Sequence, residues 1–289
     1  MKAPPAPQRL TARLLRGVPL PAPGGGKEQR GRVLAIGGSG TVPGALLLAG
    51  VAALRAGAGK LQLATVQAVA QGLALAVPEA LVLGLPADAQ GEIVRGTAAL
   101  DHALQGADAV LIGSGMRPAP ATTSLVQRAI RHARCTLVID AGALVPELRA
   151  RPGAPFVLTP HVGEMAELSG MEKARVQREP HELALAFARR TRSVLVLKGE
   201  TTFVAAPDGR LWIHPGGCHG LGTSGSGDVL AGLIAGLAAR CADALQAALW
   251  GVFAHAQAGR LLEGSVGSLG FLAREIADGV PGILDRIRG

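Results

Sequence analysis

The sequence predicts an α/β fold built on a mostly parallel central sheet with helices on both faces. Short apolar runs that end in Gly, Pro or a polar residue alternate with helix-length stretches, as strands joined by crossover helices do. The apolar content comes mainly from Ala, Leu and Val, because the 289 residues include five Phe, two Trp and no Tyr. Small aliphatic side chains suit such layers, whereas an aromatic-rich sandwich or a base-stacking surface is not expected.

The first strand is expected at 32–36 ("RVLAI"), because a glycine loop and then the apolar-periodic helix 46–56 follow this buried run. Similar runs predict further strands at 60–65, 80–86, 108–115, 136–142, 155–161 and 193–199. Most of them are separated by helix-length stretches such as 120–132 and 180–191. The loops at the carboxyl ends of these strands are where a functional site is expected.

The pattern changes after the last of these strands. Residues 201–215 predict a β-hairpin, because the Asp-Gly pair in "PDGR" favours a tight turn between "TTFVAA" and "LWIHP". The strands then cease, and consecutive helices are expected at 227–239, 243–262 and 269–286. The whole predicts a three-layer sandwich with a mostly parallel central sheet, a short β-hairpin and C-terminal helices.

Residues 1–31 differ in composition from the rest of the chain. They contain Pro-rich patches and basic residues, with no acidic residue before Glu28. This composition resembles that of a transit peptide, but there is no continuous apolar core for secretion. We expect a short helix at 8–16 followed by a surface linker. The predicted organisation is therefore an N-terminal helix and linker over 1–26 and a single domain over 27–289.

The net charge of +8, from 29 basic and 21 acidic residues, favours an anionic small molecule as partner. The Arg residues are scattered along the chain, so a nucleic-acid surface is not expected. Apolar runs such as 229–239 stop short of the ~20 residues that a membrane span needs, so no membrane partner is expected. Cys135, Cys218 and Cys241 have neither disulfide-framework nor zinc-ligand spacing, and they suit a reducing cytoplasm.

The stretch "GTSGSGDVLAG" (222–232) places one carboxylate, Asp228, where a glycine loop meets the start of a helix. The first backbone amides of a helix lack partners and bind anions, so the amides of Ser226, Gly227 and Asp228 predict an anion site. On spacing alone, Asp228 could equally be an ordinary N-cap. Four glycines favour the anion site, because a cap needs none of them and a loop close to phosphate does. A carboxylate there can accept a proton from a hydroxyl during phosphoryl transfer.

Two other glycine-rich stretches are weaker signals. "GGSGTVPG" after the first strand has the spacing GxGxxxG, not the GxGxxG of a dinucleotide fingerprint. "GAGK" at 57–60 lacks the upstream Gly and the following Ser or Thr of a P-loop. The first stretch is either a close-approach ligand loop or a tight turn, and the second is rejected as a phosphate loop.

Together, several blocks resemble the ADP-dependent NAD(P)H-hydrate dehydratases of the ribokinase-like superfamily, in the order expected of that family. The resemblance spans about residues 27–265. Its blocks are "GSGTVPGALLLAGVAALRAGAG" (38–59), "PEALV" (78–82), "IGSGM" (112–116), "LTPHVGEMAEL" (158–168), "LKGETT" (197–202) and "GTSGSGDVLAG". The resemblance implies a ribokinase-like fold and an enzyme that repairs the hydrated forms NADHX and NADPHX.

The resemblance also implies roles for individual residues. Asp228 matches the residue that activates the substrate hydroxyl, and Gly225, Ser226 and Gly227 match the anion hole. ADP then phosphorylates the hydroxyl, phosphate leaves and the ring double bond returns. Nucleotide-binding positions match Lys198, Gly199, Glu200, Thr201, Thr202 and Gly227, and substrate-binding positions match Ala45, Gly115, His161 and Asp228.

The resemblance further implies Mg²⁺ as cofactor, with ADP as co-substrate. Glu164 matches a position where the superfamily often keeps an acid linked to magnesium, and the alternative is a first-turn helix carboxylate. His161 is favoured as a ligand over a core residue, and Lys198 as a phosphate partner over a solvated strand end. His255, on an apolar helix face, is expected to be structural. A homo-oligomer, commonly a homotetramer in the family, and a separate epimerase protein are also implied.

Three departures from the family pattern leave other functions open. Gly142 in "DAGAL" stands where the family commonly has Asp, Cys218 or His219 replaces an Asn, and Val42 replaces an aromatic residue. A ribokinase-like kinase of a small alcohol, such as a vitamin precursor, would use the same anion hole. A nucleotide-binding regulator that has lost catalysis is the third hypothesis.

Overall fold

The computed structural model describes residues 6–22, 24–146, 148–241 and 243–288. Within these ranges a ten-stranded sheet runs in the order β1-β10-β9-β8-β7-β6-β5-β2-β3-β4. Its strands are β1 (Gln8–Arg9), β2 (Arg32–Ile36), β3 (Lys60–Val66), β4 (Ala80–Leu85), β5 (Ala109–Ile112), β6 (Thr136–Ile139), β7 (Phe156–Leu158), β8 (Val194–Leu197), β9 (Thr202–Ala205) and β10 (Leu211–His214). Every strand predicted from the sequence is present, within a few residues of its expected bounds.

The central part of the sheet is parallel, as the alternating pattern predicts. Strands β4, β3, β2, β5, β6, β7 and β8 pair with their neighbours in parallel, whereas β9 is antiparallel to both β8 and β10. The hairpin between β9 and β10 turns through Gly209, whose φ of +97° favours glycine. Because β2 lies between β3 and β5, the strand order reverses at its carboxyl end, where ligands bind in sheets of this kind.

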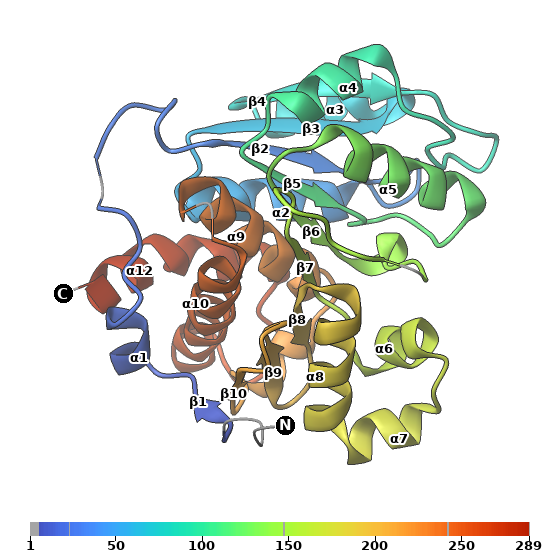
Figure 1. Ribbon diagram of the computed structural model, residues 1–289. Helices are drawn as coiled ribbons and strands as arrows, with labels where there is room; N and C mark the ends of the chain where they lie inside the picture. The colour runs from blue at the N-terminus through green and yellow to red at the C-terminus, as the bar shows by residue number, and fades with distance from the viewer. Residues whose placement is uncertain (1–5, 23, 147, 242, 289) are drawn as a thin grey trace.

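Helices cover both faces of the sheet (Figure 1). On one face lie α1 (Ala12–Arg16), α2 (Pro43–Arg55), α3 (Gln67–Ala76), α9 (Ser226–Cys241), α10 (Ala244–Ser265), α11 (Ala273–Ile276) and α12 (Val280–Arg288). On the other lie α4 (Ala98–Gln105), α5 (Pro120–His132), α6 (Val162–Ser169), α7 (Lys173–Arg178) and α8 (Pro180–Thr191). Side chains of β2 alternate between the two: Val33 and Ala35 join the first core, and Leu34 and Ile36 the second. The three-layer prediction is confirmed.

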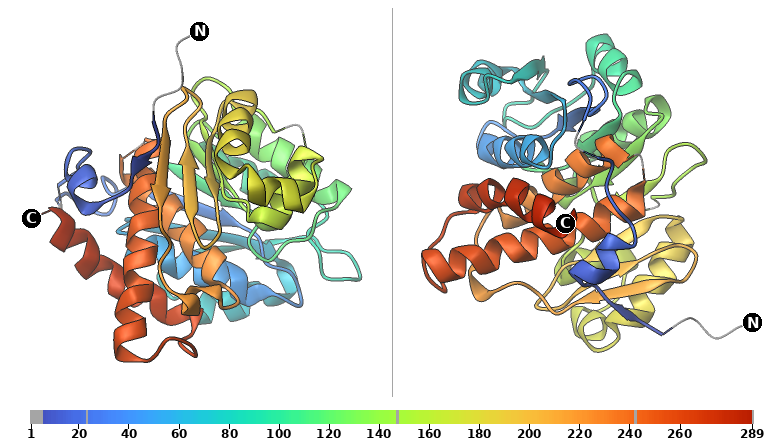
Figure 2. Two further views of the ribbon diagram at one scale, coloured as in Figure 1. Left: turned by 90° about the horizontal axis from the view of Figure 1, so that it is seen from below. Right: turned by 90° about the vertical axis from the view of Figure 1, so that its left-hand side faces the viewer.

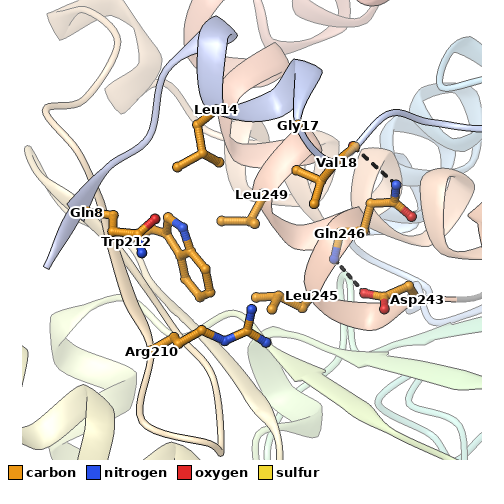
Figure 3. A pocket seen from close by; sticks show the side chains of 10 residues that line it. All are labelled: Gln8, Leu14, Gly17, Val18, Arg210, Trp212, Asp243, Leu245, Gln246 and Leu249. Atoms are coloured by element: carbon orange, nitrogen blue, oxygen red, sulfur yellow. Dashed lines mark hydrogen bonds between the residues drawn. The ribbon is translucent and has the colours of Figure 1, made fainter. Parts of the chain in front are cut away.

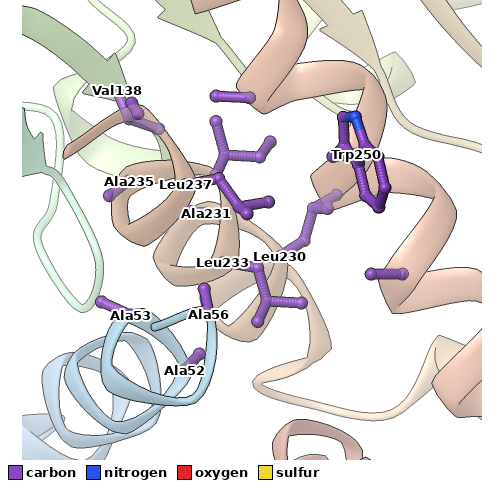
Figure 4. Close-up of a cluster of buried hydrophobic side chains, with 14 of the residues drawn as sticks. Ala52, Ala53, Ala56, Val138, Leu230, Ala231, Leu233, Ala235, Leu237 and Trp250 are labelled. Atoms are coloured by element: carbon purple, nitrogen blue, oxygen red, sulfur yellow. The ribbon is translucent and has the colours of Figure 1, made fainter. Parts of the chain in front are cut away.

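Helix α9 is the centre of the first core, between α2 and α10 (Figure 4). A Cβ on Gly232 would overlap the carbonyl oxygen of Ala49, and one on Gly236 would overlap that of Ala53. The two glycines therefore let the backbones of α9 and α2 approach closely. On the other side, a Cβ on Gly251 of α10 would lie 2.6 Å from Ile234 Cγ1 of α9, and Trp250 of α10 is fully buried beside it. This packing holds the amino end of α9 at a fixed position.

The N-terminal segment differs from its prediction. Gln8 and Arg9 form strand β1, parallel to β10, and the helix begins only at Ala12 because Thr11 caps it. The predicted surface linker also contributes to the core, since Leu20 is buried. Figure 2 shows this segment crossing the molecule beside the C-terminal helices. Residues 1–5 and 23 of the predicted segment lie outside the described residues, and the division of the chain at residue 26 stays a prediction.

The end of the chain also corrects one prediction. The single helix expected at 269–286 is two helices, α11 and α12, joined by the 3₁₀ turn η3 (Ala277–Gly279). Two other 3₁₀ turns, η1 (Ala141–Ala143) and η2 (His219–Gly222), lie in loops after β6 and before α9. Among the helices that the structure describes, none has the length and apolar character to cross a membrane.

We predict that Gly232→Ala destabilises the protein by about 1–3 kcal/mol, because the added methyl group would push α2 and α9 apart. Gly72→Ala is the matched control: Gly72 lies in the exposed helix α3 with open space around it, so alanine should stabilise by about 0.5–1 kcal/mol. Urea unfolding of both variants measures the difference. Equal stability of the two variants would contradict the close contact between α2 and α9.

Candidate active site

Polar side chains from four neighbouring strands meet at the carboxyl edge of the sheet. Ser114 follows β5, Asp140 follows β6, Glu164 stands at the start of α6 after β7, and Lys198 follows β8. These strands are parallel neighbours, so the residues that follow them lie side by side. Helix α9 starts against the same edge and adds Asp228. The cluster lies where the sequence predicts a site, at the carboxyl ends of the strands, and its function stays a prediction.

The most buried part of this cluster is an ion pair between Lys198 and Asp140. Lys198 Nζ lies 2.9 Å from Asp140 Oδ1, and the Asp140 side chain is only 3% exposed. The same oxygen accepts a hydrogen bond of 2.7 Å from Thr159 Oγ1. Burial, the largest single effect, opposes the charge on Lys198, but attraction by Asp140 and Glu164 outweighs it and raises the lysine pKa. The ammonium therefore stays charged, and removing either partner would leave the other buried and unpaired.

His161 and Glu164 form a reciprocal cap on α6. The backbone amide of His161 donates to Glu164 Oε2 at 2.7 Å, and the amide of Glu164 donates to His161 Nδ1 at 3.1 Å. Glu164 is thus a first-turn carboxylate, one of the two predicted alternatives, and it also lies 4.0 Å from Lys198 Nζ. Among the described residues, no group of three or more His, Cys, Asp or Glu side chains has the arrangement of a metal site.

The start of α9 combines free amides with a nearby ammonium. Gly225 has a φ of +89°, and a Cβ there would lie 2.5 Å from Leu48 Cδ1, so glycine is required. Within the described part of the chain, the amides of Gly227 and Asp228 have no hydrogen-bond acceptor. The prediction that the amide of Ser226 is also free is wrong, because it donates to Thr223 O at 3.3 Å. A Cβ on Gly227 would lie 3.3 Å from Lys198 Nζ, so the ammonium lies beside these amides.

Asp228 is the carboxylate whose acidity the site changes most clearly. Burial raises its pKa to about 6, and repulsion by Asp140 adds to the shift. The Ser114 hydroxyl and Lys198 oppose the shift. Among the described residues the Ser114 Oγ has no partner at hydrogen-bond distance, so no formed hydrogen bond accompanies its effect. A carboxyl group with a pKa near 6 can accept and release a proton near neutral pH.

The remaining predicted positions lie in helix α2, in the loop after β5 and in the segment after β8. Gly115 has a φ of +70°, and a Cβ there would lie 3.0 Å from the Cβ of Ala45, so these two predicted substrate positions adjoin. Gly199, Glu200 and Thr201 form an exposed to half-buried loop directly after Lys198, and Thr202 opens β9. The geometry brings all predicted positions to one edge of the sheet, and their binding roles stay predictions.

Sequence reasoning missed Asp140 as a site residue. The signal was its position directly after the apolar run "TLVI", where a carboxylate is buried only if it has a partner. The structure also explains Gly142, two residues further on. A Cβ there would overlap the carbonyl oxygen of Met116, so in this chain a larger residue would push the loop 113–117 away. Ala141, between them, has a φ of +46°, a strained value for alanine that turns the chain sharply after Asp140.

A cavity of about 420 Å³ lies apart from this cluster, between α1, β10 and the start of α10 (Figure 3). Trp212 and Leu249 line it, and Gln246 donates to the carbonyl oxygen of Val18 at 3.2 Å at its edge. None of the residues predicted for the site lines this cavity. It is therefore not part of the cluster at the strand ends.

The fold and the cluster define a protein of the ribokinase-like fold, with a lysine and a carboxylate at a glycine-rich helix start. The structure superimposes on a ribokinase-like superfamily protein from Enterococcus faecalis with a TM-score of 0.83 at 23% identity, covering 98% of this chain and 97% of the other. The family model described as NAD(P)H-hydrate dehydratase matches residues 33–281. The chain belongs to this family.

Named relatives agree with this assignment. An ADP-dependent (S)-NAD(P)H-hydrate dehydratase from Xanthomonas campestris is 65% identical over 98% of both chains. A bifunctional NAD(P)H-hydrate repair enzyme from Moorella thermoacetica is 40% identical over 90% of this chain and 50% of its own length. The structure of the ADP/ATP-dependent NAD(P)H-hydrate dehydratase from Bacillus subtilis, co-crystallised with ATP and Mg²⁺, matches with a TM-score of 0.85 at 30% identity, covering 98% and 99% of the two chains.

We predict that Asp228→Asn stabilises the protein in a pH-dependent way. Because the folded-state pKa is raised above the unfolded value, wild-type stability should fall as pH rises from about 4 to about 6. The neutral asparagine avoids this loss. Its advantage should grow from near zero at pH 4 to roughly 2–3 kcal/mol above pH 7, measured by urea unfolding across this range. A difference that does not change with pH would show that the carboxyl group titrates normally.

Proposed function

We propose that this chain is an ADP-dependent dehydratase that repairs hydrated NADH and NADPH. The observation that carries the proposal is the Asp228 carboxyl group, with its raised pKa, beside the free amides of α9 and the ammonium of Lys198. The names of the similar proteins from Xanthomonas campestris and Bacillus subtilis support it.

In the proposed reaction, Asp228 accepts the proton of the hydroxyl group on the hydrated nicotinamide ring. The hydroxyl oxygen attacks the terminal phosphorus of ADP, the phosphoryl bond to AMP breaks, and a phosphate ester forms. The ester then leaves as phosphate while the neighbouring ring carbon loses a proton, which restores the ring double bond. Phosphorylation is needed because hydroxide is a poor leaving group and phosphate a good one.

The chain's own groups stabilise charge during the transfer. The amides of Gly227 and Asp228 point at the transferring phosphoryl group, in the anion hole proposed for Gly225, Ser226 and Gly227. Lys198 supplies a positive charge beside them, and Asp140 holds that lysine in place. The ammonium of Lys198 is thus already in position before the substrate binds.

Mg²⁺ fits the site as an ion that arrives on the nucleotide. Carboxylate oxygens such as those of Asp140 and Glu164 are the hard donors that Mg²⁺ prefers, but Lys198 already contacts Asp140 Oδ1. We propose that ADP phosphates provide most of its ligands and that Glu164 contacts it through water. When bound, the ion would neutralise charge on the ADP phosphates.

We also propose binding positions on the two sides of Asp228. The nucleotide binds along Lys198, Gly199, Glu200, Thr201, Thr202 and Gly227, and the hydrated dinucleotide contacts Ala45, Gly115, His161 and Asp228. The first set forms one continuous segment and a helix start. The second set is supported by the contact between Ala45 and Gly115 described above.

The cellular setting of the enzyme is part of the proposal. We propose that residues 27–289 form the catalytic domain of a cytoplasmic homotetramer. We further propose that a separate epimerase protein converts the other hydrate epimer. This chain matches half the length of the bifunctional repair enzyme from Moorella thermoacetica, and that enzyme's name supports a pairing of two repair activities.

We predict that the purified chain with hydrated NADH, ADP and Mg²⁺ restores the absorbance band of reduced nicotinamide. Asp228→Asn should lower this rate by about 10²–10⁴, because it cannot accept the proton, while ADP still binds. Parallel reactions with ATP define the preferred nucleotide. Formation of a stable phosphate ester of a small alcohol instead would identify a kinase, and binding of ADP without any turnover would identify a regulator.

A further inference from the structure

His255 is a buried histidine that the reaction described above does not use. It lies on α10, is 9% exposed, and contacts the first residue of α9 across the helix pair. Its Nε2 lies 3.0 Å from Ser226 Oγ and 3.1 Å from the carbonyl oxygen of Ser226. Ser226 itself is 5% exposed and directly precedes Gly227 in the proposed anion hole.

The carbonyl oxygen of Ser226 decides which atom carries the hydrogen. A carbonyl oxygen can only accept, so a favourable contact with Nε2 requires that Nε2 carries the ring proton. The same N–H then points between the carbonyl and Oγ, and the Ser226 hydroxyl accepts from it. A hydroxyl that accepts from the histidine keeps its own hydrogen free to donate elsewhere.

The protonation state of His255 agrees with this assignment. Burial lowers its pKa to about 4, and the charge of Lys198 also acts against a second proton. His214 is the other histidine that opposes protonation, and its own pKa is lowered to about 4 by burial. The ring of His255 is therefore neutral near pH 7 and carries a single N–H.

Close backbone packing fixes His255 relative to the loop before α9. A Cβ on Gly251 would lie 2.6 Å from Ile234 Cγ1 of α9, and one on Gly259 would lie 2.6 Å from Leu221 Cγ. A Cβ on Gly217 would lie 3.1 Å from the carbonyl oxygen of Ala256. The stretch of α10 around His255 thus packs directly against α9 and the loop before it, and this close contact sets how near His255 lies to Ser226.

We propose that His255 is a positioning residue whose Nε2–H holds Ser226 so that the Ser226 hydroxyl donates a hydrogen bond to the phosphate being transferred. The anion hole would then contain a side-chain donor beside its backbone amides, held by a neutral histidine. This proposal rests on the proposed function, since it assigns a role within the same phosphate site.

A double-mutant cycle tests the proposal with two readouts, the rate constant kcat of the repair reaction and the dissociation constant for ADP. We expect His255→Leu and Ser226→Ala each to lower kcat by about 10–10³, because each removes one donor. Each should also weaken ADP binding several-fold. The double variant should be no less active than the less active of the two single variants, since both changes remove the hydrogen bond between His255 and Ser226.

Two further variants separate positioning from packing. Glutamine can place an N–H near the position of Nε2, so His255→Gln should restore most of the activity that His255→Leu loses. Ser169→Ala removes a hydroxyl that bonds within α6, and it should leave activity unchanged. Thermal unfolding of every variant establishes that each is folded.

Multiplicative losses in the double variant would overturn the proposal, as would full activity and unchanged ADP affinity in His255→Leu. A His255→Gln variant as inactive as His255→Leu would also overturn it. If the wild type lacks repair activity, the proposed function fails. The ADP-binding cycle still decides the role of His255 in that case, because it needs no turnover.

Discussion

The structure of the site depends on the buried contact between the ammonium of Lys198 and the carboxylate of Asp140. A lysine at this depth keeps its charge only because Asp140 and Glu164 face it, and Asp140 is itself held by Thr159. Burying such a pair is costly, so it is not the most stable solution for an edge that could have been apolar. The ion pair serves phosphate binding instead of stability, because it fixes a positive charge beside the free amides of α9.

The site also requires that helix α9 begin beside the Lys198–Asp140 pair. Its amino end is set from far along the helix, where Gly232 and Gly236 allow α9 to pack against the backbone of α2. On the other side Gly251 of α10 lies against Ile234 of α9, and His255 reaches Ser226 from α10. Asp228 therefore meets Lys198 and Asp140 in a mostly buried position. Burial raises its pKa to about 6, repulsion by Asp140 adds to the shift, and Lys198 opposes it. The packing of α9 in the core therefore determines where the acid–base group lies.

The sequence predicts the layers well because parallel strands buried on both faces leave uninterrupted apolar runs, as β5 and β6 do. It fails at the ends of the chain, where β1 is only two residues long and depends on pairing with distant β10. The glycine loop at 222–232 locates Asp228, and the resemblance of "LKGETT" to the family locates Lys198. Asp140 and the partner of His255 escape sequence reasoning, because their roles arise from contacts across 58 and 29 residues.

Burial beside the Lys198–Asp140 pair thus sets the acidity of Asp228, with Lys198 holding its pKa down. The most direct test is a carbon-13 NMR titration of the Asp228 carboxyl group in the wild type and in Lys198→Met. We expect a pKa of about 6 in the wild type and a higher one in the variant, because Lys198 lowers it. A carboxyl group that titrates near 3.8 in the wild type, or that does not respond to loss of the lysine, would contradict it.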